Sequence, residues 1–150
     1  MMRLFLLTVC AAAGVVAAGC DENLKTITGP TPELTTTFAS IQQNIFAAPD
    51  SSGRVACTGC HTSVGRTPSA GLDLSGASAH AQLVNAASNG KPGAVRVIPG
   101  DPENSYLIHK IDGRPGIVGL RMPRGTTGPF LTDGQVRVIK RWIEIGAPNN

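Results

Sequence analysis

The pattern of apolar residues predicts a first helix over residues 36–47. At 100° per residue its apolar side chains fall on one face; they are Phe38, Ile41 and Ile45, with Phe46 at the edge. Pro49 and Asp50 end this helix. A glycine-rich loop over residues 65–76 follows further along the chain and carries two leucines, Leu72 and Leu74.

Two shorter helices are expected in the middle of the chain. Over residues 78–88, one face carries Leu83, Val84 and Ala87, with His80 in the middle of it. A third helix is expected to begin at Asp101 and Pro102, because aspartate is a good N-cap and proline suits the first helical position. Its apolar arc of about 100° consists of Leu107, Ile108 and Ile111, and Gly113 ends it.

The last helix has the clearest signals. Thr132 and Gln135 form a capping box, and Leu131 and Val136 form a hydrophobic staple around it. Beyond them one side is apolar and the other is charged. The apolar residues are Val138, Ile139, Trp142, Ile143 and Ile145, and the charged ones are Arg137, Lys140, Arg141 and Glu144. Gly146 and Pro148 end the helix.

Together these segments predict one small all-α domain. Alternation typical of a strand is found only at Val95 to Val97. The 18 glycines and 11 prolines are about a fifth of the 150 residues, against a usual ~12%, so much of the chain is expected to be loop. Aromatic residues are only 4%, which makes a thin core that a large apolar cofactor would complete.

The N-terminal segment is expected to be an export signal rather than a membrane span. An apolar run from Leu4 to Gly19 follows Arg3, and it is shorter than the ~20 residues of a spanning helix. The run ends in small residues before Cys20, which resembles the lipobox of bacterial lipoproteins, whose cysteine carries a lipid anchor. We expect a signal peptide over 1–19, a threonine- and proline-rich tether over 20–37 and the domain over 38–150. The alternative is ordinary cleavage, which leaves a soluble exported protein.

The predicted domain contains one cysteine pair, in the pattern Cys57-Thr58-Gly59-Cys60-His61. Two thiols three residues apart on one helical turn can reach the two vinyl groups of a haem, and the next imidazole can reach its iron; this is the attachment pattern of c-type haem. In an exported protein the two thiols can instead form a disulfide. Structural zinc sites usually pair two such clusters, and only one is present. A thioredoxin-like redox pair needs a strand–helix–strand context that the pattern does not show.

With His61 on one side of the iron, Met122 is our candidate for the other. It is the one methionine left after the predicted signal peptide. Pro123 favours an extended backbone at Met122, so its thioether can project from a loop; the alternative is a methionine that fills a gap in the core. Sulfur is a soft ligand for iron, and Met/His ligation raises the reduction potential. His80 is the competing candidate for this ligand, and an open coordination position on the iron is the third alternative. His109 is expected to face solvent.

These residues resemble a class I cytochrome c. More narrowly, the chain is similar to planctomycete-type haem domains and exported lipoprotein cytochromes of bacteria. The resemblance covers about residues 38–148 and rests on the segments GCHT, GLDL, RVIPGDPENSYLIHKIDG, RMPRG and LTDGQVRVIKRWIEIGAP. It implies a helical fold with the N- and C-terminal helices packed against each other beside the haem. It also implies that Cys57 and Cys60 form thioethers and that His61 and Met122 are the proximal and distal ligands.

The expected function is one-electron transfer by a monohaem c-type cytochrome in an exported electron-transfer chain. Iron held from both sides has no free position for a substrate, and no serine–histidine–aspartate, HExxH or phosphate-loop pattern competes; the protein is therefore not expected to be an enzyme. Two other functions stay open. One is a haem-based sensor or an electron-entry subunit of a larger redox enzyme, and the other is a haem-free structural lipoprotein with a Cys57–Cys60 disulfide.

The distribution of charge along the chain leads us to expect a redox partner as well. The net charge of +3 is too weak to indicate nucleic-acid binding. However, residues 20–90 carry three basic and five acidic residues, and residues 91–150 carry nine and five. Arg121 and Arg124 flank Met122 and are candidates to contact haem propionates or an acidic partner. Trp142 is expected in the core and is a further candidate propionate donor.

Overall fold

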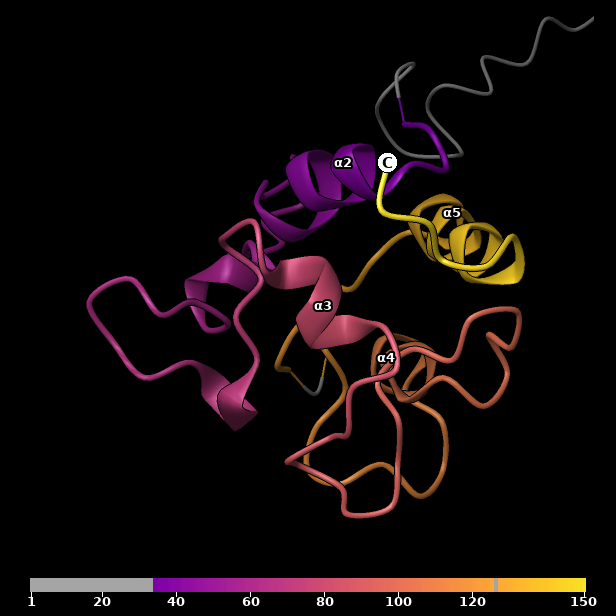
Figure 1. Cartoon of the computed structure of the whole chain (residues 1–150). Coiled ribbons are helices and arrows are strands. Elements are labelled where there is room, and N and C mark those ends of the chain that lie inside the picture. The colour runs from indigo at the N-terminus through magenta and orange to yellow at the C-terminus, as the bar shows by residue number, and fades with distance from the viewer. Residues whose placement is uncertain (1–33, 126) are drawn as a thin grey trace, which may run out of the picture.

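The computed structural model describes residues 34–125 and 127–150, which form short helices joined by long loops (Figure 1). In place of a sheet, this part of the chain has only isolated bridges between pairs of residues. The all-α prediction is therefore confirmed for the described residues. The predicted signal peptide, Cys20 and the tether up to residue 33 lie outside them. None of the described helices combines the length and the apolar character needed to cross a membrane.

The first helix runs from Phe38 to Phe46. It consists of α2 over Phe38–Ile41 and the π-helical turn η1 over Gln42–Phe46, and the apolar face predicted for it is buried. The hydroxyl of Thr37 caps it by accepting from the Ser40 N–H at 3.2 Å. Leu34 packs against the same core, so ordered contacts begin in the last residues of the segment that we expected to be tether.

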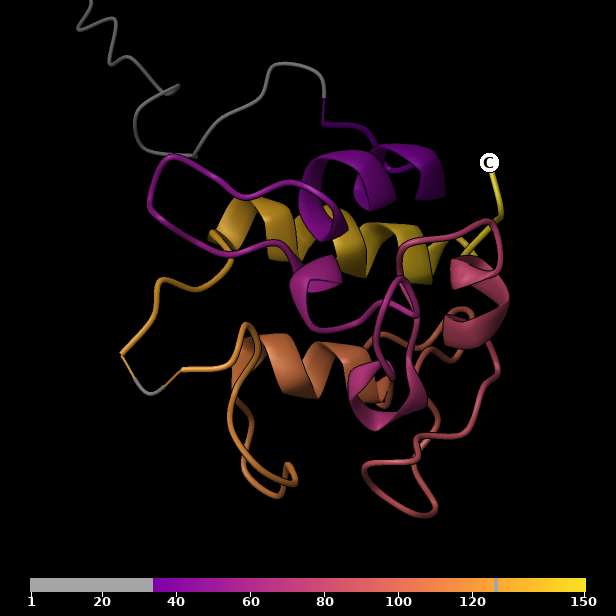
Figure 2. The same ribbon diagram turned by 90° about the vertical axis from the view of Figure 1, so that its left-hand side faces the viewer.

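The N-terminal helix packs against the C-terminal helix α5, which covers Asp133–Glu144. Figure 2 shows α5 running beside α2 and η1, with α4 on its other side. The rings of Phe38 and Trp142 are 5.5 Å apart between centroids. The chain end closes this arrangement: the Asn150 carbonyl accepts from the Ala39 N–H at 2.8 Å, and its side-chain oxygen accepts from the Phe38 N–H at 3.0 Å. Two N–H groups that have no partner within the helix are thereby satisfied.

The start of α5 follows the predicted signals, whereas its end does not follow all of them. The Thr132 hydroxyl accepts from the Gln135 N–H at 3.2 Å, and the Gln135 side chain accepts from the Thr132 N–H at 3.0 Å. The predicted staple residues, Leu131 and Val136, are both buried. Ile145, which we placed on the apolar side, is 46% exposed. Ile145 is the C-cap of α5 and has a ψ of 11°. Its backbone is therefore no longer helical, and its side chain does not continue the buried face of the helix.

The helix predicted over residues 78–88 ends early. α3 covers Ala79–Leu83, and Val84 already has an extended backbone with a ψ of 125°. Beyond it the chain pairs with a later segment: Val84 lies opposite Val97, and Ala87 lies opposite Val95. Asn85 makes the exit with a φ of 55°, in the left-handed region that asparagine tolerates. The prediction of helix for residues 84–88 is therefore wrong, because pairing with a distant segment replaces the last helical turn.

The helix predicted from Asp101 begins later. α4 covers Tyr106–Asp112, with Ser105 as its N-cap. The Asp101 carboxylate accepts from the Asn104 N–H at 3.1 Å, so it closes a separate turn before the helix. The Ser105 hydroxyl then donates to the Asp101 carbonyl at 2.7 Å. The other end is as predicted, since Gly113 stops α4 with a φ of 72°.

Asp73 holds the glycine-rich loop that leads from Cys60 to α3. Its carboxylate accepts from the hydroxyl groups of Ser63 and Ser75 and from the Ser75 N–H at 2.8 Å. These bonds lower the pKa of Asp73 from 3.8 to about 2. The neighbours of Asp73 in the chain are Leu72 and Leu74, so the same bonds fix the backbone of two leucines that line the cavity described below.

We expect Asp73→Asn to reduce the acid sensitivity of the fold. Because the pKa is about 2 in the folded protein and 3.8 is its ordinary value, the carboxylate stabilises the fold fully above about pH 4 and this contribution is lost as the pH falls toward about 2. Chemical denaturation at a series of pH values over this window measures the effect. The free energy of unfolding should fall more steeply in the wild type than in Asp73→Asn, with Ser63→Ala in between. Equal slopes in all three proteins would contradict this role of Asp73.

Candidate haem site

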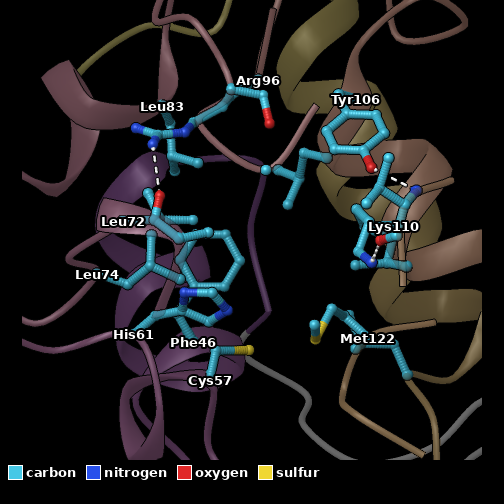
Figure 3. Close-up of a pocket in the computed structure, with 17 residues that line it drawn as sticks. Phe46, Cys57, His61, Leu72, Leu74, Leu83, Arg96, Tyr106, Lys110 and Met122 are labelled. Carbon is cyan, nitrogen blue, oxygen red and sulfur yellow. Dashed lines mark hydrogen bonds between the residues drawn. The ribbon is translucent and has the colours of Figure 1, made fainter. Parts of the chain in front are cut away.

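Cys57, Cys60 and His61 lie on one tight turn. The 3-10 turn η2 covers Cys57–Gly59, and the Cys57 carbonyl accepts from the N–H groups of Cys60 at 3.1 Å and His61 at 2.9 Å. The turn places the thiol of Cys57 and the imidazole of His61 against one cavity (Figure 3). Both cysteines are free thiols.

The imidazole of His61 is oriented by the loop that follows it. Its Nδ1 lies 3.1 Å from the Ser69 carbonyl, and because a carbonyl only accepts, Nδ1 carries the proton. Nε2 is then left with a free lone pair, as a metal ligand requires. Burial lowers the pKa of His61 below its ordinary value of 6.5, which favours the neutral ring. A second bond, from the Leu74 N–H to the His61 carbonyl at 2.9 Å, ties the residue to the cavity wall.

The two thiols differ in their surroundings. Cys57 is half-buried at the cavity, and burial raises the pKa of its thiol above the ordinary value of 9.0. Cys60 is exposed and is not among the residues that line the cavity. The structure thus places the side chains of Cys57 and His61 at the cavity, but not the side chain of Cys60. An exposed side chain changes rotamer freely, so the position of Cys60 on the turn matters more than the direction of its thiol.

Met122 lies across the cavity from His61. In Figure 3 the Met122 side chain projects from one wall toward the opposite wall, where His61 and Cys57 lie with Phe46, Leu72 and Leu74. The space between the walls is about 980 Å³, including the part open to solvent. The lining is mostly apolar, with an imidazole on one side and a thioether on the other. These residues therefore fit a flat apolar ring whose central metal takes a nitrogen and a sulfur ligand.

α4 holds the loop that carries Met122. The Met122 N–H donates to the Lys110 carbonyl at 2.8 Å. The Lys110 ammonium donates to the carbonyls of Val118, at 2.9 Å, and Leu120, and the Val118 N–H donates to the hydroxyl of Tyr106 at 2.9 Å. The thioether is thus placed by four bonds from one helix rather than by the loop alone.

The structure places the two competing histidines elsewhere. His80 lies 5.0 Å from the Phe38 ring, edge to face, and its Nε2 bonds the Ala147 carbonyl at 2.8 Å. His109 bonds the Glu103 carbonyl at 2.7 Å. Neither is among the residues that line the cavity. In this structure both imidazoles tie chain segments together.

The residues considered for the haem propionates also lie outside the cavity lining. Arg121 donates to the Ile111 carbonyl at 2.8 Å and stacks on the Phe130 ring at 4.0 Å. Arg124 is exposed. Trp142 is fully buried in the core, as expected, and its indole N–H donates to the Pro148 carbonyl at 2.9 Å.

Sequence reasoning missed four polar residues of the cavity wall, Ser88, Arg96, Tyr106 and Lys110. For Lys110 a signal was present, because it follows Leu107 by three residues and precedes Ile111, and so shares the apolar face of α4. Tyr106 lies on α4 directly before Leu107, but the predicted apolar arc left it out. Arg96 gave no signal, since a single arginine in a loop usually faces solvent.

A buried arginine fixes the segment that enters the cysteine turn. Arg54 is 1% exposed, and its Nε pairs with the Asp50 carboxylate at 2.8 Å. Its terminal nitrogens donate to the carbonyls of Ile45 at 3.2 Å and Ala48 at 2.9 Å. Burial alone would raise the pKa of Asp50, but the bonds from Ser52 and Arg54 outweigh it and lower the pKa below 3.8. Arg54 therefore joins the end of the first helix to the residues just before Cys57.

The described residues bear on the alternatives to haem as follows. Residues 34–125 and 127–150 contain no group of three or more histidine, cysteine or acidic side chains that could hold a metal ion. Cys57 and Cys60 are not bonded to each other in this structure, and the described part of the chain lacks the strands of a thioredoxin-like fold.

Comparison with known families agrees with the geometry. Residues 57–123, a little under half of the chain, match the family model described as planctomycete cytochrome C. The matched segment contains the cysteine pair, His61 and Met122. Neither the curated proteins nor the solved structures provide a match. This match confirms the resemblance found in the sequence and supports a cytochrome c-type domain in this chain.

Proposed function

We propose that this protein is a monohaem c-type cytochrome that carries single electrons. A cytochrome c-type domain implies a covalently attached haem; in this proposal Cys57 and Cys60 would hold it through thioethers, and His61 and Met122 would bind its iron. The observation that carries the proposal is that His61 and Met122 face each other across an apolar cavity that Cys57 also lines (Figure 3). The bound haem supplies a one-electron couple between ferric and ferrous iron.

The residues of this chain suit that role because both ligands are held. The Ser69 carbonyl fixes the His61 ring, and Lys110 fixes the Met122 backbone and the loop before it. Ligands that stay in place in both oxidation states let an electron pass with little rearrangement. If His61 and Met122 both bind the iron, no coordination position would remain for a substrate, which favours a carrier over an enzyme.

We further propose that the protein is exported and anchored through a lipid on Cys20. The domain would then meet its redox donor and acceptor in the cell envelope. Arg124 and Arg137 are exposed and would be available to an acidic docking face on a partner. The other basic residues of α5 are less available, because Lys140 pairs with Asp112 at 3.0 Å and Arg141 pairs with Glu144 at 3.2 Å.

Met122→Ala tests the proposed ligation. The variant is expected to lose the methionine-to-iron charge-transfer band near the red end of the spectrum, to have a lower reduction potential and to bind CO when reduced. The wild type should keep the band and not bind CO. His80→Gln is the control, because His80 is the other histidine that was considered as a ligand, and it should behave like the wild type.

Two results would contradict this assignment. If the band survives in Met122→Ala, another residue supplies the sixth ligand. If reduced wild type binds CO readily, the distal ligand is displaceable, which favours a haem-based sensor over a carrier.

A further inference from the structure

Arg96 is a buried cation in the wall of the cavity. It is only 8% exposed. One terminal nitrogen of its guanidinium donates to the Gln82 carbonyl at 2.7 Å, and the other donates to the Ala70 carbonyl at 3.2 Å. These bonds hold the side chain in place, but they leave its positive charge without an opposite charge.

Within residues 34–125 and 127–150, no carboxylate pairs with this guanidinium. The ion pairs of that part of the chain involve Arg54, Arg114, Lys140 and Arg141. None of the residues that line the cavity is aspartate or glutamate, whereas Lys110 is a second cation among them. Burial lowers the pKa of Arg96, in keeping with a charge that has lost water. Since burying an unpaired charge is costly, the cavity favours an occupant with negative groups.

Arg96 and Cys57 lie at opposite ends of the cavity (Figure 3). In a haem, the vinyl groups that form thioethers and the two propionates are on opposite edges of the ring. A haem attached at Cys57 would therefore direct its propionates toward the end where Arg96 lies. Tyr106 lines the same cavity and is 6% exposed; its hydroxyl accepts from the Val118 N–H and so retains its own hydrogen as a donor.

We propose that Arg96 binds a haem propionate as a buried ion pair, with the Tyr106 hydroxyl as an additional donor at that end of the cavity. This inference rests on the proposed function. It replaces the expectation that Arg121, Arg124 or Trp142 fills this role. The Arg121 guanidinium and the Trp142 indole are engaged with carbonyls away from the cavity, and Arg124 is exposed.

The test compares holoprotein of the wild type with Arg96→Gln, Arg96→Lys and Arg124→Gln. Loss of the Arg96 charge removes a cation beside the haem, so the oxidised state gains stability. In equilibrium with a redox mediator we expect Arg96→Gln to shift about tenfold toward the oxidised form, which is about 59 mV for one electron. Arg96→Lys should retain most of the wild-type potential. The exposed Arg124→Gln should change it far less, because solvent and salt screen its charge.

An infrared readout separates an ion pair from a merely nearby charge. In redox difference spectra of protein with 13C-labelled haem carboxylates, the propionate bands should move in Arg96→Gln and stay in place in Arg124→Gln. The proposal is overturned if Arg96→Gln forms holoprotein with its methionine band intact while neither the potential nor the propionate bands change.

If Arg96→Gln does not accumulate, nuclear magnetic resonance of the reduced wild type tests the proposal without a variant. Nuclear Overhauser contacts are expected between the Arg96 guanidinium protons and the propionate methylene protons, and their absence from assigned spectra would overturn the proposal. A protein that carries no haem would instead contradict the proposed function, so the two failures are distinguishable.

Discussion

Cys57→Ala is expected to yield a protein without stably attached haem that accumulates poorly. Cys57 is the cysteine that lines the cavity, and without it the ring loses a covalent link next to its proximal ligand. Each ~100 Å² of porphyrin face that is buried against the apolar walls contributes about 2.5 kcal/mol. An empty cavity would leave those walls exposed to water, so loss of the haem weakens the fold as well as ending electron transfer.

Thr58→Ala is the matched control for this prediction. Thr58 lies between the two cysteines on the same turn, and its replacement keeps both thiols and His61. Haem content per polypeptide, from the haem absorbance of denatured protein, and the yield of folded protein are measured for both variants. A folded, haem-free Cys57→Ala protein at the yield of Thr58→Ala would show that the domain does not depend on the haem for stability.

Arg54→Leu is expected to destabilise the domain by about 3–5 kcal/mol, the usual cost of breaking a buried ion pair on one side. The Arg54 side chain is fully buried, and that of Asp50 is 9% exposed. Without Arg54, the carboxylate of Asp50 and the carbonyls of Ile45 and Ala48 lose a charged donor. Denaturant unfolding of the holoprotein measures the change.

Arg141→Leu is the control for an exposed pair. Arg141 is 63% exposed on its side chain and lies 3.2 Å from Glu144, so its loss should cost less than about 1 kcal/mol. Similar midpoints for Arg54→Leu and the wild type would mean that the buried pair contributes nothing net. Because Arg54 secures the segment before Cys57, we also expect Arg54→Leu to reduce the yield of haem-loaded protein.

Helix signals that involve only neighbouring residues were reliable predictors. The capping box of Thr132 and Gln135 and the left-handed stop at Gly113 are present as predicted. The buried face of the first helix also matches its pattern. In these places the residues that decide the structure lie within one or two turns of each other, so periodicity and capping describe them fully.

Prediction failed where a distant segment decides the structure. Residues 84–88 have a helical pattern, but the pairing of Val84 with Val97 and Ala87 with Val95 replaces the helix. Asp101 is a good N-cap residue, but it closes a local turn instead of starting the helix. The Ser105 hydroxyl donates to the Asp101 carbonyl, and Ser105 is the N-cap of α4. Local propensity is too small to outweigh such contacts.

The residues of the candidate site fall into the same two groups: those set by neighbouring residues and those set by distant segments. Cys57, Cys60 and His61 could be predicted because their chemistry depends on spacing within one turn. Met122 could be proposed from its residue type and the proline after it. Arg96 could not, because its burial depends on carbonyls of residues 70 and 82, which only the folded chain brings to it.

The most direct test of the account is the mass of the mature protein, produced in a host that attaches haem to cytochromes and combined with a haem spectrum under denaturing conditions. We expect the intact mass to exceed that of the polypeptide by one haem, with the haem spectrum retained after denaturation because the thioethers persist. A lipid on Cys20 would add its own mass increment. A colourless protein with the mass of the bare polypeptide would contradict the account.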